Sequence, residues 1–73
     1  MTSTTLRFSL NGEHAEVAVG STVADAVALL LQDESPRGVA VSLDRCVIPR
    51  SEWDCTPVPP GALVEVVGAA AGG

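Results

Sequence analysis

Hydrophobic and polar residues alternate at the start of this chain. In the stretch "LRFSL", Leu6, Phe8 and Leu10 alternate with Arg7 and Ser9. A period of two is typical of a strand that is buried on one face only. The pattern therefore predicts that the first element is a half-buried strand.

A second alternating stretch, "HAEVAV", follows an Asn-Gly pair at 11–12. This dipeptide is the strongest short signal for a two-residue hairpin turn, because both residues tolerate a positive φ. Ala15, Val17 and Val19 are expected to face the core. We therefore predict a β-hairpin over residues 5–19.

The period changes to that of a helix in "STVADAVALLL". Thr22 is placed to cap this helix, and Asp25, three residues later, is placed as its capping-box partner. Pro36 and Gly38 are expected to end the helix and free the turn that follows. The apolar residues share one helical stripe, which we expect to cover the hairpin: Val23, Ala26, Val27, Leu30 and Leu31.

Turn-forming residues divide the second half of the chain into short elements. They are expected to be a strand at 39–43, a tight turn at Asp44 and Arg45, a short strand at 46–49, a helical turn at 51–54 capped by Ser51, a proline-rich loop at 56–61 and a last strand at 62–67. The order is strand, strand, helix, strand, strand, short helix, strand. A right-handed crossover returns the chain to the same sheet after the helix.

This order of elements predicts an α+β protein with the β-grasp, or ubiquitin-like, fold. The mixed sheet would have about five strands, with one main helix packed across it. We expect residues 1–67 to form this domain and residues 68–73 to form a flexible C-terminal Gly-Gly tail. No internal repeat or second domain is visible in the 73 residues.

The composition restricts the possible functions of the chain more than it restricts the possible folds. The net charge is −5, and the four basic residues are scattered arginines, which argues against a nucleic-acid partner. No stretch approaches the roughly 18 apolar residues of a membrane span. The N-terminal "MTSTT" lacks the features of a signal peptide. We therefore expect a cytoplasmic protein with no membrane partner.

The two cysteines, Cys46 and Cys55, are expected to be free thiols that pack as small hydrophobic residues. They lack the doublet spacing of a zinc site, and two thiols are too few for an iron–sulfur cluster. No metal site is therefore predicted.

Trp53 and Arg50 have structural interpretations beside functional ones. We expect Trp53 to be buried in the core, because a small fold with two aromatic residues tends to bury them. Arg50 is expected to pair with Glu52 or Asp54 on the surface, although contact with a carboxylate of a partner is the alternative.

The chain finishes with six residues that have almost no side chains: Gly68, Ala69, Ala70, Ala71, Gly72 and Gly73. Six extended residues reach about 20 Å, and glycine permits close approach of another backbone. Such a segment can thread into a partner and present its terminal carboxylate to a buried active site. The carboxylate becomes reactive once ATP converts it into an adenylate. The alternative is an idle, flexible end.

Two apolar residues of the last strand, Leu63 and Val67, are expected to face away from Val64 and Val66. If the helix covers one face of the sheet only, they form an exposed patch for docking a partner. The alternative is that the final loop covers them.

The C-terminal part of the chain resembles the thiamine-biosynthesis sulfur carriers, the ThiS family. The stretch "VIPRSEWDCTPVPPGALVEVVGAAAGG", residues 47–73, is similar to that family's pattern. Its sharpest parts are Pro49-Arg50, Trp53 and Gly72-Gly73, and the "NG" hairpin and the helix match in position. The family often has "DGD" before the last strand, where this chain has residues 60–62, "PGA".

The resemblance implies a carrier that is a co-substrate and no enzyme, with no cofactor bound to it. An E1-like adenylyltransferase (ThiF-like) would adenylate Gly73 with ATP and magnesium. A sulfur donor such as a cysteine desulfurase would supply the sulfur of a terminal thiocarboxylate. A thiazole synthase (ThiG-like) would use this sulfur for the thiazole ring of thiamine.

Three other functions share the same tail and remain open. They are the small subunit of a molybdopterin-synthase-like enzyme, a sulfur carrier for another natural-product pathway, and a ubiquitin-like protein modifier. An interaction module with an idle tail is a further alternative.

Overall fold

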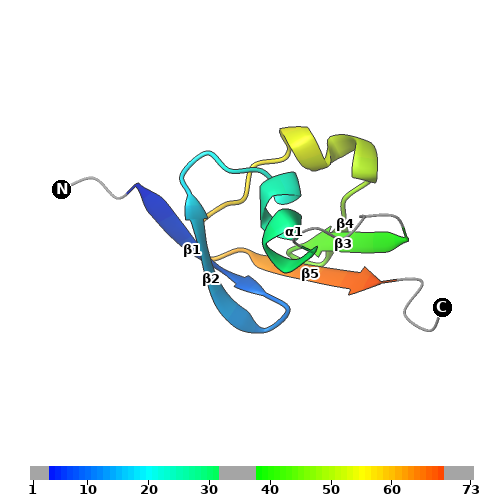
Figure 1. Ribbon diagram of the computed structural model, residues 1–73, viewed down its shortest axis with the longest axis horizontal. Helices are drawn as coiled ribbons and strands as arrows, with labels where there is room; N and C mark the ends of the chain where they lie inside the picture. The colour runs from blue at the N-terminus through cyan, green and yellow to red at the C-terminus, as the bar shows by residue number, and fades with distance from the viewer. Residues whose placement is uncertain (1–3, 32–37, 69–73) are drawn as a thin grey trace.

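The computed structural model describes residues 4–31 and 38–68 (Figure 1). The elements follow the predicted order: β1 (Thr5–Leu10), β2 (Glu13–Ala18), α1 (Val23–Leu31), β3 (Val39–Leu43), β4 (Cys46–Val47), the 3₁₀ helix η1 (Arg50–Cys55) and β5 (Leu63–Gly68). Within this part of the chain, no helix has the length and hydropathy needed to cross a membrane.

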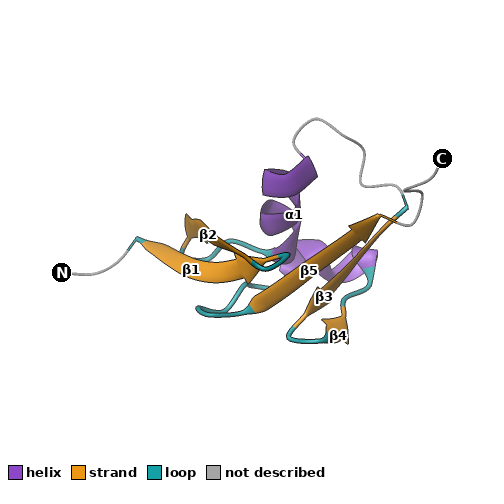
Figure 2. Ribbon diagram, turned by 90° about the horizontal axis from the view of Figure 1, so that it is seen from below, coloured by secondary structure: helices purple, strands orange, loops and turns teal. Residues whose placement is uncertain are grey.

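The five strands form one mixed sheet in the order β2-β1-β5-β3-β4. β1 and β5 run parallel at the centre, and the other neighbours are antiparallel. α1 packs on one face of this sheet, and no helix of the described residues lies over the opposite face (Figure 2). The predicted α+β architecture, with a mixed five-stranded sheet and one main helix, is confirmed.

The first hairpin forms as predicted, but its last valine does not face the core. Asn11 and Gly12 both have positive φ, 52° and 84°, and β1 pairs with β2 over the full length of both strands. β2 ends at Ala18, and Val19 is 60% exposed. The prediction that Val19 is buried is wrong. Its N–H still donates to the carbonyl of Thr4, but β2 has ended and the chain turns at Gly20, which has a positive φ.

The helix begins with the predicted capping box. The backbone N–H of Thr22 donates to Oδ2 of Asp25 at 2.9 Å, and the N–H of Asp25 donates to Oγ1 of Thr22 at 3.4 Å. Val23, Ala26 and Val27 are buried.

The C-terminal turn of α1 is less buried than the helical stripe predicts. Leu30 is 44% exposed, so its expected place in the core is wrong. α1 leans away from the sheet toward its C-terminal end (Figure 2). Leu30 lines an open hollow beside β2 instead of packing in the core. Residues 32–37, including Pro36, which was expected to end the helix, lie outside the described residues.

The second hairpin also has the predicted turn, since Asp44 and Arg45 have φ values of 49° and 72°. The helical turn after β4 begins earlier than expected, at Arg50. Ser51 therefore lies inside η1, and the prediction that Ser51 caps it is wrong. The capping position belongs to Pro49, whose carbonyl accepts the N–H of Glu52 at 2.8 Å.

The proline-rich loop contributes two residues to the core, Val58 and Ala62, each 3% exposed. Backbone hydrogen bonds attach this loop to the start of α1. The N–H of Val58 donates to the carbonyl of Ser21 at 3.0 Å, and the N–H of Val23 donates to the carbonyl of Thr56 at 2.8 Å. The loop thereby closes the end of the core beside α1.

Trp53 is buried as predicted, at 5% exposure, and its indole N–H donates to the carbonyl of Ile48 at 2.9 Å. The two cysteines differ from the prediction. Cys46 and Cys55 are free, but both are exposed and neither packs as a core residue. Cys46 lies on the short edge strand β4 and Cys55 at the end of η1, two places that the core does not reach.

Candidate functional site

The expected functional segment follows β5, the strand between β1 and β3. Gly68 is the last residue of β5 and is paired with Val39, so its assignment to the tail is corrected by one residue. Ala69, Ala70, Ala71, Gly72 and Gly73 lie outside the described residues. Their role in threading into a partner therefore stays a prediction.

β5 is held unequally by its two neighbours. Its antiparallel register with β3 runs over five residue pairs, from Val64 opposite Leu43 to Gly68 opposite Val39. Its parallel register with β1 covers two pairs only, because β1 ends at Leu10. The last residues of β5 would therefore have backbone partners on one side only.

The side chain of Asn11 continues the pairing where β1 stops. The N–H of Val66 donates to Oδ1 of Asn11 at 2.8 Å, and Nδ2 of Asn11 donates to the carbonyl of Val66 at 3.3 Å. The backbone N–H of Asn11 also donates to the carbonyl of Val64 at 2.9 Å. Asn11 thus fixes β5 two residues before Gly68.

Asp44 binds the other end of β5 in a similar way. Its backbone N–H donates to the carbonyl of Leu63 at 2.7 Å, and the N–H of Leu63 donates to Oδ1 of Asp44 at 2.9 Å. The sequence pattern assigns Asp44 and Asn11 to turns only. Turn chemistry identifies such residues, but no local pattern indicates which distant strand their side chains bind.

The face of the sheet opposite α1 carries an exposed apolar group beside the end of β5. Val67 is 63% exposed and lies opposite Ala40 of β3, which is also exposed. Val47 of the edge strand β4 is 74% exposed, and the register places it on the same face. We call Ala40, Val47 and Val67 the open-face patch.

Leu63, the second expected docking residue, belongs less clearly to this surface. It is half-buried and lies opposite Ser9 of β1, at the start of β5. Between it and Val67, Glu65 accepts a hydrogen bond from the hydroxyl of Ser42 at 3.3 Å. Leu63 is therefore separated from the open-face patch by polar side chains.

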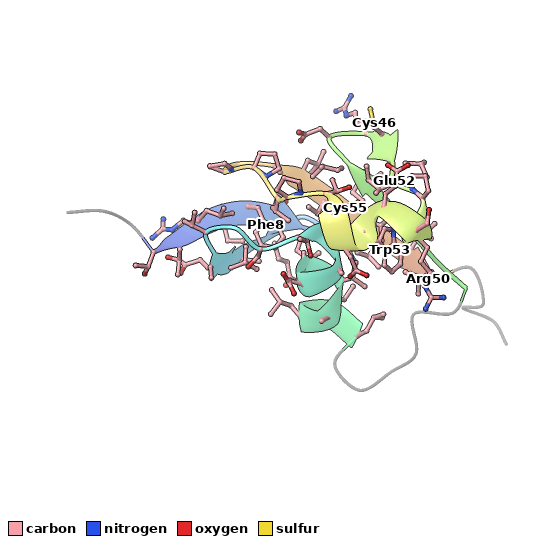
Figure 3. All side chains as sticks on the ribbon, turned by 90° about the horizontal axis from the view of Figure 1, so that it is seen from above. Phe8, Cys46, Arg50, Glu52, Trp53 and Cys55 are labelled. Atoms are coloured by element: carbon pink, nitrogen blue, oxygen red, sulfur yellow. The ribbon has the colours of Figure 1, made fainter. Side chains whose placement is uncertain are left out.

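Arg50 lies at the same end of the molecule as the end of β5 (Figure 3). Among the described residues the one salt bridge joins Arg7 to Glu16, at 3.2 Å. The expected pairing of Arg50 with Glu52 or Asp54 is therefore wrong. The guanidinium lies over the Trp53 ring instead, 6.0 Å from its centroid.

Two hollows lie beside β2, with volumes of about 440 and 250 Å³. Their described lining includes His14 and Ala15 in both cases, with Arg7 and Glu16 in the larger and Leu30 in the smaller. No β5 residue is among this lining. Residues 4–31 and 38–68 also contain no group of three or more metal-ligating side chains.

What these residues provide is a rigid base from which the chain continues beyond Gly68. The sheet order, with parallel central strands and one helix across a face, defines the β-grasp class of ubiquitin-like proteins. The model of the ThiS family matches residues 8–73, and the chain therefore belongs to the ThiS family.

A solved structure supports this assignment. The crystal structure of the thiamine biosynthesis protein ThiS from Geobacter metallireducens is similar, with a TM-score of 0.71 and 26% sequence identity. The match covers 85% of this chain and 91% of that chain. Among proteins with curated functions, no sequence matches this chain.

Proteins of the ThiS family are non-catalytic sulfur carriers, and no bound cofactor is known for the family. Membership indicates a carrier role in thiamine biosynthesis and implies interaction with ThiF-like and ThiG-like partners. The resemblance to this family that residues 47–73 suggested is confirmed.

Proposed function

We propose that the carboxylate of Gly73 is the group that carries sulfur. An E1-like, ThiF-like adenylyltransferase adenylates it, and a sulfur donor such as a cysteine desulfurase then converts it to a thiocarboxylate. A ThiG-like thiazole synthase takes the sulfur for the thiazole ring. The observation that carries this proposal is the family match, which runs through Gly72 and Gly73 to residue 73.

The chemistry requires only a backbone terminus from this chain. A carboxylate oxygen attacks the α-phosphate of magnesium-bound ATP, and pyrophosphate leaves. A sulfur nucleophile then attacks the acyl carbon, and AMP leaves with the bonding electrons. When the nucleophile is a persulfide, a reducing thiol cleaves the resulting S–S bond and releases the thiocarboxylate.

The arrangement of β5 supports delivery of the terminus to a partner. Five residues separate Gly68 from the end of the sequence, and in extended form they reach about 17 Å. Asn11 and the β3 register hold the last residues of β5 in place. The carboxylate would therefore reach a buried active site while the folded domain stays at its entrance.

We further propose that the open-face patch contributes to docking on these partners. Val67 is the residue before Gly68, so of the β5 side chains it lies nearest in sequence to the tail that a partner would bind. Its 63% exposure leaves its side chain available for an apolar contact. Leu63, which is half-buried, would contact the partner at the border of the same face.

The decisive experiment is intact-mass spectrometry of the full chain. Incubation with a cognate ThiF-like adenylyltransferase, MgATP and a persulfide source should shift the mass by one oxygen-to-sulfur exchange. Deleting Gly73 should abolish the shift while the circular dichroism spectrum and the melting temperature stay unchanged. A wild-type chain that never changes mass with an active adenylyltransferase would contradict the proposal.

A second measurement identifies the acceptor. The thiocarboxylate form should lose its sulfur when a ThiG-like thiazole synthase and its substrates are added, and the carboxylate mass should return. A thiocarboxylate that forms but is not consumed would assign the carrier to another sulfur pathway. Isopeptide-linked conjugates in cells would instead indicate a protein modifier.

A further inference from the structure

Two exposed arginines, Arg45 and Arg50, lie near opposite ends of the paired strands β3 and β5. Arg45 belongs to the β3–β4 turn, next to Asp44, which is hydrogen-bonded to Leu63 at the start of β5. Arg50 follows β4 and begins η1. Neither arginine forms a salt bridge with another described residue.

Arg50 lies level with the end of β5. The N–H of Ile48 donates to the carbonyl of Val41 at 2.9 Å, so the chain after β4 still runs alongside β3. Pro49 is extended, with φ of −58° and ψ of 143°, and carries Arg50 on toward the level of Val39. Val39 is paired with Gly68, and Figure 3 shows Arg50 at this end of the molecule.

No carboxylate of the described residues is paired with Arg50. Glu52 and Asp54 are two and four residues away on the same short helix, yet neither is bonded to it. The first turn of a helix favours acidic side chains over basic ones. The Trp53 ring lies at 6.0 Å, the outer limit of a cation–π contact, so it orients the guanidinium while leaving its N–H donors free.

We propose that Arg50 is a docking residue that binds an acidic side chain of the adenylyltransferase at the entrance through which the tail passes. This inference rests on the proposed function. The complementary group is an acid because the guanidinium of Arg50 has no carboxylate partner among the described residues. In a chain with a net charge of −5, such a contact distinguishes one orientation of the complex from the others. The planar guanidinium suits this task because it binds a carboxylate through two parallel hydrogen bonds.

The length of the tail separates Arg50, the proposed docking residue, from the carboxylate that reacts. In an extended tail the Gly73 carboxylate lies about 17 Å beyond Gly68. Arg50 is attached to the folded domain at the level of Gly68 and does not reach the reacting carboxylate. It is therefore a positioning residue, and its loss should weaken binding of the carrier while leaving the rate of the bound complex unchanged.

Arg45 provides the matched control, because it has the same charge and is also exposed, but lies at the far end of β5. The full-length variants R50K, R50Q, R50E, R45Q and R45E would be compared in adenylation by a ThiF-like adenylyltransferase, with pyrophosphate release as the measured signal. R50E should raise the KM for the carrier about tenfold or more with kcat unchanged, and R45E should change KM by less than about twofold. R50K should lie between wild type and R50Q.

Several outcomes would overturn the docking role. Equal KM changes in R45E and R50E would show a response to net charge only. A lower kcat at unchanged KM in R50Q would place the effect in chemistry. Tryptophan fluorescence and the melting temperature show whether each variant is folded. If R50E is not folded, the comparison is made with R50K and R50Q.

Direct binding keeps this proposal distinct from the proposed function. Calorimetric titration of the same variants into the adenylyltransferase measures affinity without turnover. Weaker binding of R50Q than of R45Q, with no adenylation of wild type, would support the docking role and overturn the proposed function. Equal affinities of R50Q, R45Q and wild type would overturn the docking role even if adenylation proceeds.

Discussion

The two faces of the sheet differ in how far their apolar side chains are exposed to solvent. On the face under α1, Phe8, Val41 and Val64 are exposed by only 2%, 1% and 0%. On the opposite face, Val67 is 63% exposed, and Val47 on the edge strand is 74% exposed. The strands are shared, so adjacent positions of one strand have separate roles: one side stabilises the fold and the other is available to a partner.

The largest effect on stability is expected at Trp53, the one aromatic residue in the second half of the chain and a member of the core. Replacing Trp53 by Ala should lower the free energy of unfolding by about 3–5 kcal/mol. A domain of this length has a total stability of about 4–11 kcal/mol, so the variant should be largely destabilised. Urea denaturation followed by circular dichroism measures the loss.

Trp53→Phe is the control for this change. It keeps a buried ring but removes the indole N–H that donates to the carbonyl of Ile48, and should cost less than the alanine variant. An alanine variant as stable as wild type would show that the ring is not part of the core.

The comparison of the two faces is tested most directly by two valines of β5. Val64→Ala should cost about 2 kcal/mol, because it removes two buried methyl groups and leaves a cavity. Val67→Ala should change stability by less than about 0.5 kcal/mol, because its side chain is exposed. Both changes alter strand propensity in the same way, so the difference in denaturation midpoint reports burial. Equal costs would refute the distinction between the faces.

Asn11 offers a test of how the end of β5 is held. Asn11→Gly keeps a residue that tolerates the positive φ but removes the side chain that binds Val66, at an expected cost of about 1–2 kcal/mol. Hydrogen exchange of the Val66 amide should accelerate by more than that of the Val41 amide. Asn11→Asp, which keeps Oδ1 as an acceptor, should retain part of the protection. An unchanged exchange rate at Val66 in the glycine variant would rule out this role.

The smallest effect is expected for the surface ion pair. The side chains of Arg7 and Glu16 are 82% and 54% exposed, so solvent screens their attraction. Glu16→Gln should lower stability by less than about 1 kcal/mol, and the difference should disappear in 1 M salt. Thermal melts at low and high salt check both statements. A larger or salt-independent loss would point to a packing role for Glu16.

Much of the fold can be predicted from the sequence, because its signals are local. The Asn-Gly pair requires a left-handed turn, and the Thr22–Asp25 spacing requires a capped helix start. Alternation and helical periodicity then assign each segment its type. The two-residue turn at Asp44 and Arg45 and the burial of Trp53 followed from equally local arguments. The family resemblance of residues 47–73 added the function.

The tertiary structure decided the positions that depend on where a covering element ends. Val19 and Leu30 fit the core pattern but are exposed, whereas Val58, in an apparent loop, is buried. Asn11 binds Val66 across 55 residues of sequence. Arg50 forms no salt bridge with Glu52 or Asp54, its acidic neighbours in the sequence, and lies level with the end of β5. Periodicity describes one segment at a time, whereas burial and partner choice depend on the dimensions of two segments packed together.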